Sequence, residues 1–275
     1  MVKDILIADM HTHSEYSHDS VCSIEDMCIS QISKGTKIFA ITDHCDVFSF
    51  KDYDIFAPIK EAYNEVATLN KKYHNKCLLL SGVEISEGFW FPEENKKIHN
   101  LVPYDVIIGS VHCVKCKDLN IPYSEINFSH LSIEKIYEYL DCYFNDIITM
   151  LENTDFDILA HLTCPLRYIV GKYGLSIDLK AYDEQITKIF ELIIDKNIAL
   201  EINASSYGVL NVFMPNESLI KKYYSMGGNL ITLGSDAHIA KNASINFDKA
   251  IDTLKEIGFE NICYFKDREI NTINI

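Results

Sequence analysis

Residues whose side chains bind metal ions follow short apolar segments along the whole sequence, and this repeated pattern restricts the fold most. Nine such residues are present: His11, His13, His18, His44, Glu84, His112, His161, Asp236 and His238. The apolar segments are rich in Ile, Leu and Val, as expected for strands that are buried on both faces. They span Ile5–Met10, Lys37–Thr42, Cys77–Val83, Asp105–Val111, Phe156–Ala160, Ile198–Ile202 and Asn229–Leu233. Because parallel strands of a barrel end at one face, these side chains should converge at one mouth.

Helical patterns lie between the seven predicted strands, and the alternation predicts an α/β barrel. The clearest helix is Ile133–Leu151, in which apolar residues recur with a spacing of 3.6. Its expected buried face comprises Ile133, Ile136, Tyr137, Leu140, Phe144, Ile147, Ile148 and Leu151. Ser23 is a predicted N-cap, and Gly35 and Gly227 suit the left-handed backbone that ends helices. We expect a single barrel domain over residues 1–275.

Two long segments, Cys113–Ser132 and Thr163–Lys180, interrupt the alternation on the mouth side of the barrel. Long loops at this position shape substrate pockets. Their residues available to a substrate's organic part are Tyr123, Glu125, Phe128, Tyr168 and Tyr173. The first segment also holds Cys113 and Cys116, but a single Cys-x-x-Cys pair outside a redox fold predicts no thiol function. The tail Arg268–Ile275 could be a final strand or a frayed end.

The charge and the cysteines restrict the partners and the compartment. A formal charge of −15 would repel nucleic acid and anionic membranes, so an anionic substrate must be attracted locally by bound cations. Nine scattered cysteines fit reduced thiols better than a disulfide framework. The N-terminus lacks a secretory pattern, and no apolar stretch approaches the roughly 18 residues that span a bilayer. We therefore expect a cytoplasmic protein.

Two pairs of candidate ligands have a spacing that suits one metal each. His11 and His13 alternate along a strand and point to the same side, and Asp236 and His238 repeat this geometry after the last strand. Glu84 is informative because a carboxylate after a buried strand is costly unless it is paired or bound to metal, and it can bridge two cations.

The remaining histidines carry weaker predictions. His44, His112 and His161 each end an apolar strand, where the alternative to a ligand is a hydrogen-bonded histidine of the core. His18 lies in a loop, and for it the alternative is an ordinary surface histidine. Three histidines fall in helix or loop sequence and are expected to be exposed: His74, His99 and His130.

Taken in order, the blocks His-x-His, Thr-Asp-His, Gly-Val-Glu, Gly-Ser-Val-His, Ala-His and Ser-Asp-Ala-His resemble the polymerase and histidinol phosphatase (PHP) superfamily. Within it, the chain is most similar to the histidinol-phosphate phosphatases. The resemblance extends from about Asp9 to His238. It implies a distorted seven-stranded (β/α) barrel and a site for three divalent transition metals, which can be zinc, manganese or iron. All nine candidate residues fill ligand positions, and we assume that Glu84 is a bridge.

The resemblance also implies the reaction, the hydrolysis of L-histidinol phosphate to L-histidinol and phosphate in histidine biosynthesis. Phosphatase members are similar in carrying an arginine after the fifth-strand histidine, here Arg167, which can bind phosphate bidentately, with Tyr168 beside it. Metal-bound hydroxide would attack phosphorus. The candidates that deliver a proton to the leaving oxygen are His18, His44 and Asp236. Ligand orientation is expected to depend on hydrogen bonds from Asp43, Glu201 and Asn203.

Three alternatives stay open. A phosphodiesterase or exonuclease with the same metals would need a basic groove, yet few cationic residues are near the mouth: Lys115, Lys117, Arg167 and Lys172. Another small phosphate ester could be the substrate. A metal-stabilised scaffold without catalytic activity would be indicated by missing ligands, and the set is complete.

Overall fold

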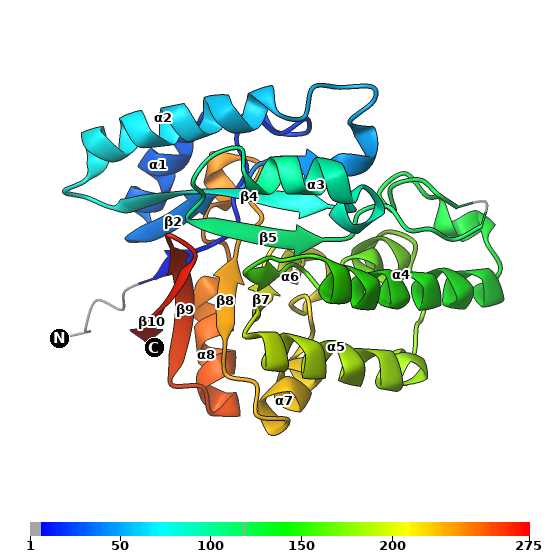
Figure 1. Cartoon of the computed structure of the whole chain (residues 1–275). Helices are drawn as coiled ribbons and strands as arrows, with labels where there is room; N and C mark the ends of the chain where they lie inside the picture. The colour runs from blue at the N-terminus through cyan, green and yellow to red at the C-terminus, as the bar shows by residue number, and fades with distance from the viewer. Residues whose placement is uncertain (1–6, 118) are drawn as a thin grey trace.

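A parallel sheet closed into a barrel forms the centre of the computed structural model, which describes residues 7–117 and 119–275 (Figure 1). Its strands are β1 (Ala8–Asp9), β2 (Ile38–Ile41), β3 (His44–Asp46), β4 (Leu78–Ser86), β5 (Val106–Ser110), β6 (Ile158–Leu159), β7 (Ala199–Asn203) and β8 (Ile231–Gly234). The order is β1-β2-β4-β5-β6-β7-β8, with the short β3 paired to β4. A parallel bridge between Thr12 and Ala237 joins the first and last strands. The predicted barrel is therefore confirmed.

Two differences from the predicted strands affect the site, one extended strand and one strand that was not predicted. The third predicted strand continues to Ser86, so that Glu84 lies inside β4 and not after it. His44 begins a separate strand, β3, whose residues pair with β4 in the register His44 to Glu84. The predicted first strand includes residues 5 and 6, which lie outside the described residues. Tertiary pairing with a neighbouring strand extends strands beyond the apolar run that marks them in the sequence.

Helices cover the outside of the barrel. They are α1 (Ile24–Ser33), α2 (Ala57–Tyr73), α3 (Pro92–His99), α4 (Ile133–Asn153), α5 (Asp183–Lys196), α6 (Tyr207–Leu210), α7 (Glu217–Ser225) and α8 (Phe247–Ile257). Shorter helical turns span Val47–Ser49, Gly88–Trp90, Phe128–His130, Arg167–Lys172, Leu179–Tyr182 and Ala240–Asn242. In Figure 1, α2 runs along β4, and α4 and α5 lie side by side. The predicted caps are present: Ser23 Oγ accepts a hydrogen bond from Asp26, and Gly35 and Gly227 have positive φ.

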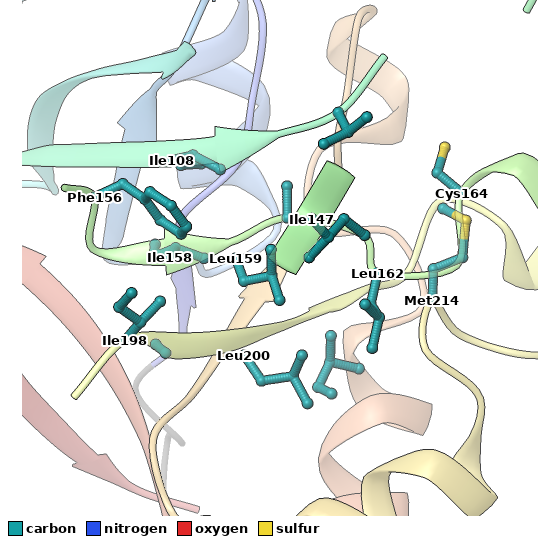
Figure 2. Close-up of a cluster of buried hydrophobic side chains, with 14 of the residues drawn as sticks. Ile108, Ile147, Phe156, Ile158, Leu159, Leu162, Cys164, Ile198, Leu200 and Met214 are labelled. Carbon is teal, nitrogen blue, oxygen red and sulfur yellow. The ribbon is translucent and has the colours of Figure 1, made fainter. Parts of the chain in front are cut away.

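Helix α4 shows how the core is packed. Figure 2 shows Ile147 of this helix among the side chains of β5, β6 and β7. The predicted buried face was partly wrong, because Ile133 is 43% exposed. Residues outside the predicted face are buried instead: Tyr139, Tyr143 and Met150. Tyr123 and Phe128 of the long segment after β5 pack against Tyr143 and Tyr139, so the buried surface is wider than one apolar stripe.

A hairpin of two further strands follows the barrel, β9 (Asn261–Lys266) and β10 (Glu269–Asn274), so the tail is a final strand. Asp267 and Arg268 form its turn, and both have the positive φ that suits tight hairpins. The turn lies at the amino ends of the barrel strands, since Arg268 N donates to Asp105 O at 2.9 Å. Strand β9 was not predicted.

Other expectations concern single residues and the chain as a whole. His74 and His130 are exposed, but His99 is half-buried, contrary to its predicted exposure. All nine cysteines are free thiols, and Cys113 and Cys116 are buried. Among the helices of residues 7–117 and 119–275, none combines the length and the apolarity that a membrane crossing requires.

Candidate metal centre

Glu84 lies at the centre of the barrel mouth and is fully buried. Imidazole nitrogens surround its carboxylate, at 2.9 Å (His161 Nε2), 3.2 Å (His112 Nε2), 2.7 Å (His44 Nδ1), 3.4 Å (His11 Nε2) and 3.8 Å (His13 Nε2). Strand pairing produces this arrangement, because β4 has β3 on one side and β5 on the other. We divide the surrounding side chains into three groups by these distances, and His44, Asp46 and His112 form a further cluster whose ligand atoms lie within 4.8 Å of one another.

The first group is His11, His13 and Asp236, whose ligand atoms lie within 4.8 Å of one another. The two histidines alternate after β1 and point the same way, as predicted. Asp236 Oδ1 is 3.3 Å from His13 Nε2 and 3.9 Å from His11 Nε2. Asp236 has a φ of 50°, a left-handed conformation that is unusual for a residue other than glycine.

The second group is Glu84, His112 and His161. Both Nε2 atoms approach the same carboxylate oxygen, Glu84 Oε1, and they lie 3.5 Å apart. Their rings are stacked with centroids 5.4 Å apart. His112 comes from the end of β5 and His161 from the end of β6, which are neighbours in the sheet.

The third group combines His44, His238 and Asp19, a residue that was not predicted. The two histidine Nε2 atoms are 3.3 Å apart, and the Asp19 carboxylate lies 3.2 Å from His238 and 3.6 Å from His44. His18, the predicted ligand beside it, has 68% of its side chain exposed and borders the group, with its ring centroid 5.4 Å from that of His44 and Nδ1 3.5 Å from Asp46. A loop without strand periodicity gave no sign of which neighbour points inward.

Further carboxylates orient these imidazoles. Glu201 Oε1 is 2.6 Å from His11 Nδ1, and Glu201 Oε2 accepts the backbone N–H of His161. Asp46, also unpredicted, lies 3.1 Å from His112 Nδ1. A ring held at one nitrogen presents the other nitrogen in a fixed direction. The alternation of His44 and Asp46 in β3 is the signal that would have identified Asp46, since both side chains face the same way.

The other predicted supporting residues also contact the site. Asn203 Nδ2 lies 3.4 Å from Asp236 Oδ2. Asp43 accepts hydrogen bonds from Ser14 and Ser17, and Ser17 Oγ is 3.1 Å from His13 Nδ1.

The residues fit divalent cations. Several buried ligand-type atoms make no well-aligned hydrogen bond: His11 Nε2, His13 Nε2, His44 Nδ1, His161 Nδ1 and Glu84 Oε2. The contact of 2.7 Å between His44 Nδ1 and Glu84 Oε2 is an example, since the two atoms are close but not aligned for a hydrogen bond. Burial disfavours the charged form of Glu84, but the surrounding histidines outweigh this effect and lower its pKa well below the ordinary value. Burial, together with the neighbouring histidines, lowers the pKa of His13 well below the ordinary value. Burial also disfavours the charged forms of His11 and His112, but nearby carboxylates outweigh this effect and raise the pKa of both imidazoles well above the ordinary value. Zn²⁺ and related metals bind carboxylates and deprotonated imidazoles, so a bound cation would displace these protons.

A comparison with protein families decides the relationship: the model of the PHP domain matches residues 9–205. This chain belongs to the PHP domain family. Among curated relatives, a probable histidinol-phosphatase of Clostridium acetobutylicum is 29% identical, over 93% of this chain and 97% of that protein. A histidinol-phosphatase of Lactococcus lactis is 28% identical, over 96% of both chains.

Solved structures agree with the fold of this PHP protein. A crystal structure of histidinol phosphate phosphatase from Lactococcus lactis, complexed with zinc, L-histidinol and phosphate, matches with a TM-score of 0.81 and 25% identity, over 96% of this chain and 98% of that chain. A second structure, a putative histidinol phosphatase from Listeria monocytogenes, matches with a TM-score of 0.73 at 14% identity and shows the fold alone.

The long segment after β6 borders the PHP metal centre. Arg167 begins the helical turn Arg167–Lys172 and is half-buried, with Nη1 3.4 Å from Ser205 Oγ. Ser205 Oγ also lies 3.4 Å from Asp236 Oδ2, so the guanidinium shares a polar neighbour with the first group. Tyr168 packs against Tyr123 with ring centroids 5.5 Å apart.

The remaining candidates for substrate contact are placed less favourably. Tyr123 packs edge to face against His112, with centroids 6.0 Å apart, and is itself almost fully buried. Phe128 is fully buried in the core, and Glu125 is exposed. Tyr173 is half-buried, and its hydroxyl donates to Ile126 O at 3.4 Å. Arg167 and Tyr168 are therefore the better placed pair.

Proposed function

We propose that this PHP protein is a metal-dependent phosphomonoesterase that converts L-histidinol phosphate to L-histidinol and phosphate. The observation that carries the proposal is the convergence of histidines and carboxylates around Glu84, with Arg167 beside them. The choice of substrate is supported by the histidinol-phosphatases to which the chain is similar over nearly its full length.

Each ligand group would hold one cation, which makes three. The first would be held by His11, His13 and Asp236, the second by Glu84, His112 and His161, and the third by His44, His238 and Asp19. Glu84 contacts histidines of all three groups and suits a shared ligand. When bound, divalent cations lower the pKa of water to about 7 and neutralise charge on phosphoryl oxygens.

The chain's own residues bind and orient the ester. Arg167 donates to phosphoryl oxygens, and its planar guanidinium matches two of them at once. Ser205 Oγ donates to Asn203 Oδ1 at 2.6 Å and is free to accept from Arg167, which holds the guanidinium at the mouth.

Cleavage of the phosphorus–oxygen bond leaves an alcohol oxygen that needs a proton. His18 is the one predicted proton donor that lies outside the three groups, because His44 and Asp236 belong to them. An imidazole outside the metal groups keeps a nitrogen that can carry a proton, so we assign the general acid to His18.

A diesterase remains the second candidate, and kinetics separate the two. Purified protein loaded with zinc should hydrolyse L-histidinol phosphate with a kcat/KM at least about 100-fold above that for a phosphodiester reporter. Sugar phosphates and nucleotides serve as competing monoesters. Comparable rates on the diester would overturn the proposal, as would full activity after the metals are removed by chelation.

A further inference from the structure

A buried glutamate outside the ligand set holds the backbone of one proposed ligand. Glu87 follows the end of β4, is 0% exposed and has a φ of 50°. Its Oε1 accepts two backbone hydrogen bonds, from His112 N at 2.6 Å and from Cys113 N at 3.0 Å. Its Oε2 is buried without a hydrogen-bond partner.

The position of Glu87 explains why these two N–H groups need a side chain. The ladder between β4 and β5 ends at the pair Ser86 and Ser110. The residues after this pair leave the sheet. The carboxylate of Glu87 therefore accepts the hydrogen bonds from His112 N and Cys113 N that a carbonyl of a neighbouring strand would otherwise accept. The carbonyl of His112 is also bound, since Tyr123 N donates to it at 3.0 Å. Both the backbone N–H and the backbone carbonyl of His112 are therefore hydrogen-bonded.

The backbone conformation and the burial of Glu87 both cost free energy of folding, which argues for a role beyond folding. A residue other than glycine in the left-handed region costs about 1 to 3 kcal/mol, and a buried carboxylate oxygen without a partner adds a desolvation cost. A glycine at this position would relieve the strain, and an apolar side chain would avoid the desolvation. Neither could hold the backbone of His112.

We propose that Glu87 is a positioning residue for the second ligand group. Its carboxylate fixes the backbone from which His112 projects, while Asp46 fixes the ring, so that His112 Nε2 meets Glu84 and His161. The inference rests on the metal-binding part of the proposed function. Glu87 itself does not contact the substrate or a cation in this account.

Three variants test this role through zinc binding. Glu87→Gly removes the carboxylate and suits the positive φ, and Glu87→Met removes both acceptors at similar length. Glu87→Gln is the matched control, because one amide oxygen can still accept from both N–H groups. Zinc per chain is measured after equilibration with a competing chelator, and anomalous diffraction at the zinc edge locates the ions.

We expect the Gly and Met variants to lose zinc from the second ligand group alone. Glu87→Gly and Glu87→Met should weaken zinc binding at the second group by about 10- to 100-fold, the usual cost of losing a residue that supports a metal ligand. Zinc at the first and third groups should be retained, and Glu87→Gln should match the unaltered protein. Thermal unfolding of the metal-free forms shows whether each variant folds.

Two outcomes would overturn the inference. If a folded Gly or Met variant keeps full zinc occupancy at the second group, Glu87 does not position His112. If Glu87→Gln loses zinc as strongly as the other variants, the charge and not the backbone contact is responsible. Failure of the unaltered protein to bind zinc would contradict the proposed function instead, so the two failures are distinguishable.

Discussion

At the residue scale, carboxylates contributed by other parts of the chain orient the histidines of the mouth. Glu201 contacts Nδ1 of His11, and Asp46 contacts Nδ1 of His112. Because each imidazole has two nitrogens, fixing one of them directs the other. Substitution of a residue that does not contact the substrate is therefore expected to change the orientation of the metal-binding nitrogens.

The proposed phosphate contact gives the first prediction. Arg167→Met should lower kcat/KM for L-histidinol phosphate by about 100-fold, because one donor to the transition state is lost. Zinc content should stay unchanged, since Arg167 belongs to none of the three ligand groups. Arg167→Lys is the matched control and should recover only part of the activity, because an ammonium group cannot bind two oxygens in the same plane. Near-full activity of the Met variant would remove Arg167 from the mechanism.

The different positions of His18 and Asp19, neighbours in the loop between β1 and α1, give the second prediction. Asp19→Ala should lower bound zinc by about one ion per chain, because the third group loses its carboxylate. His18→Ala should keep all zinc while slowing hydrolysis by about 100-fold, as expected for loss of a proton donor. Metal analysis and steady-state kinetics on both variants check this pair. The reverse pattern of metal loss would return His18 to the ligand set.

At the element scale, the β9–β10 hairpin closes the barrel at the end opposite the metal centre. The guanidinium of Arg268 contacts Asp157 at 3.0 Å and Asp155 at 2.9 Å. Asp157 Oδ2 in turn accepts a hydrogen bond from Ile107 N at 2.7 Å, so the ion pair between Arg268 and Asp157 is connected to the start of β5. The hairpin ties strands that are distant in the sequence.

Loss of the ion pairs of Arg268 gives the third prediction. Arg268→Ala should lower the free energy of unfolding by about 1 to 2 kcal/mol, because Asp157 is buried and would lose its cationic partner, while Asp155 is exposed and contributes little. Catalysis by the folded enzyme should be unaffected. Denaturant unfolding measures the change, and Lys266→Ala, an exposed residue of the same hairpin, is the control. Equal stability of both variants would contradict the role of the ion pair.

At the scale of the whole molecule, the barrel is closed by a buried carboxylate as well as by backbone pairing. Asp9 in β1 accepts hydrogen bonds from Gln31, from the backbone and hydroxyl of Ser235 beyond β8, and from Ser244. The same closure brings the first ligand group together, because His11 follows β1 and Asp236 follows β8. We therefore expect folding and metal binding to be coupled.

This coupling gives the fourth prediction. Removal of the metals by a chelator should lower the melting temperature by about 5 to 10 °C, since ligands at 100 times their Kd stabilise by about 2.7 kcal/mol. Readdition of zinc should restore it. His112→Asn removes one ligand and should show a smaller shift, which serves as the control. A melting temperature unaffected by chelation would argue against bound metals.

The sequence by itself determined most of the elements and most of the site. Alternating apolar runs and helical stripes are local patterns, and they predicted the seven strands and the position of α4. Eight of the nine predicted ligands meet at the mouth, because the end of a parallel strand has a fixed place in a barrel. His11 and His13 could be paired from their spacing alone.

Only the tertiary structure decided which side chains complete the site. Asp19 approaches both His44 and His238, whereas His18 lies at the exposed edge beside Asp46. Asp46 and Glu87 hold His112, and the β9–β10 hairpin covers the far end of the barrel. The physical reason is that loop conformation and strand extension depend on partners that are distant in the sequence. Local periodicity fixes the direction of a side chain inside a strand, but beyond the strand's last residue that direction is set by the contacts that the folded chain supplies.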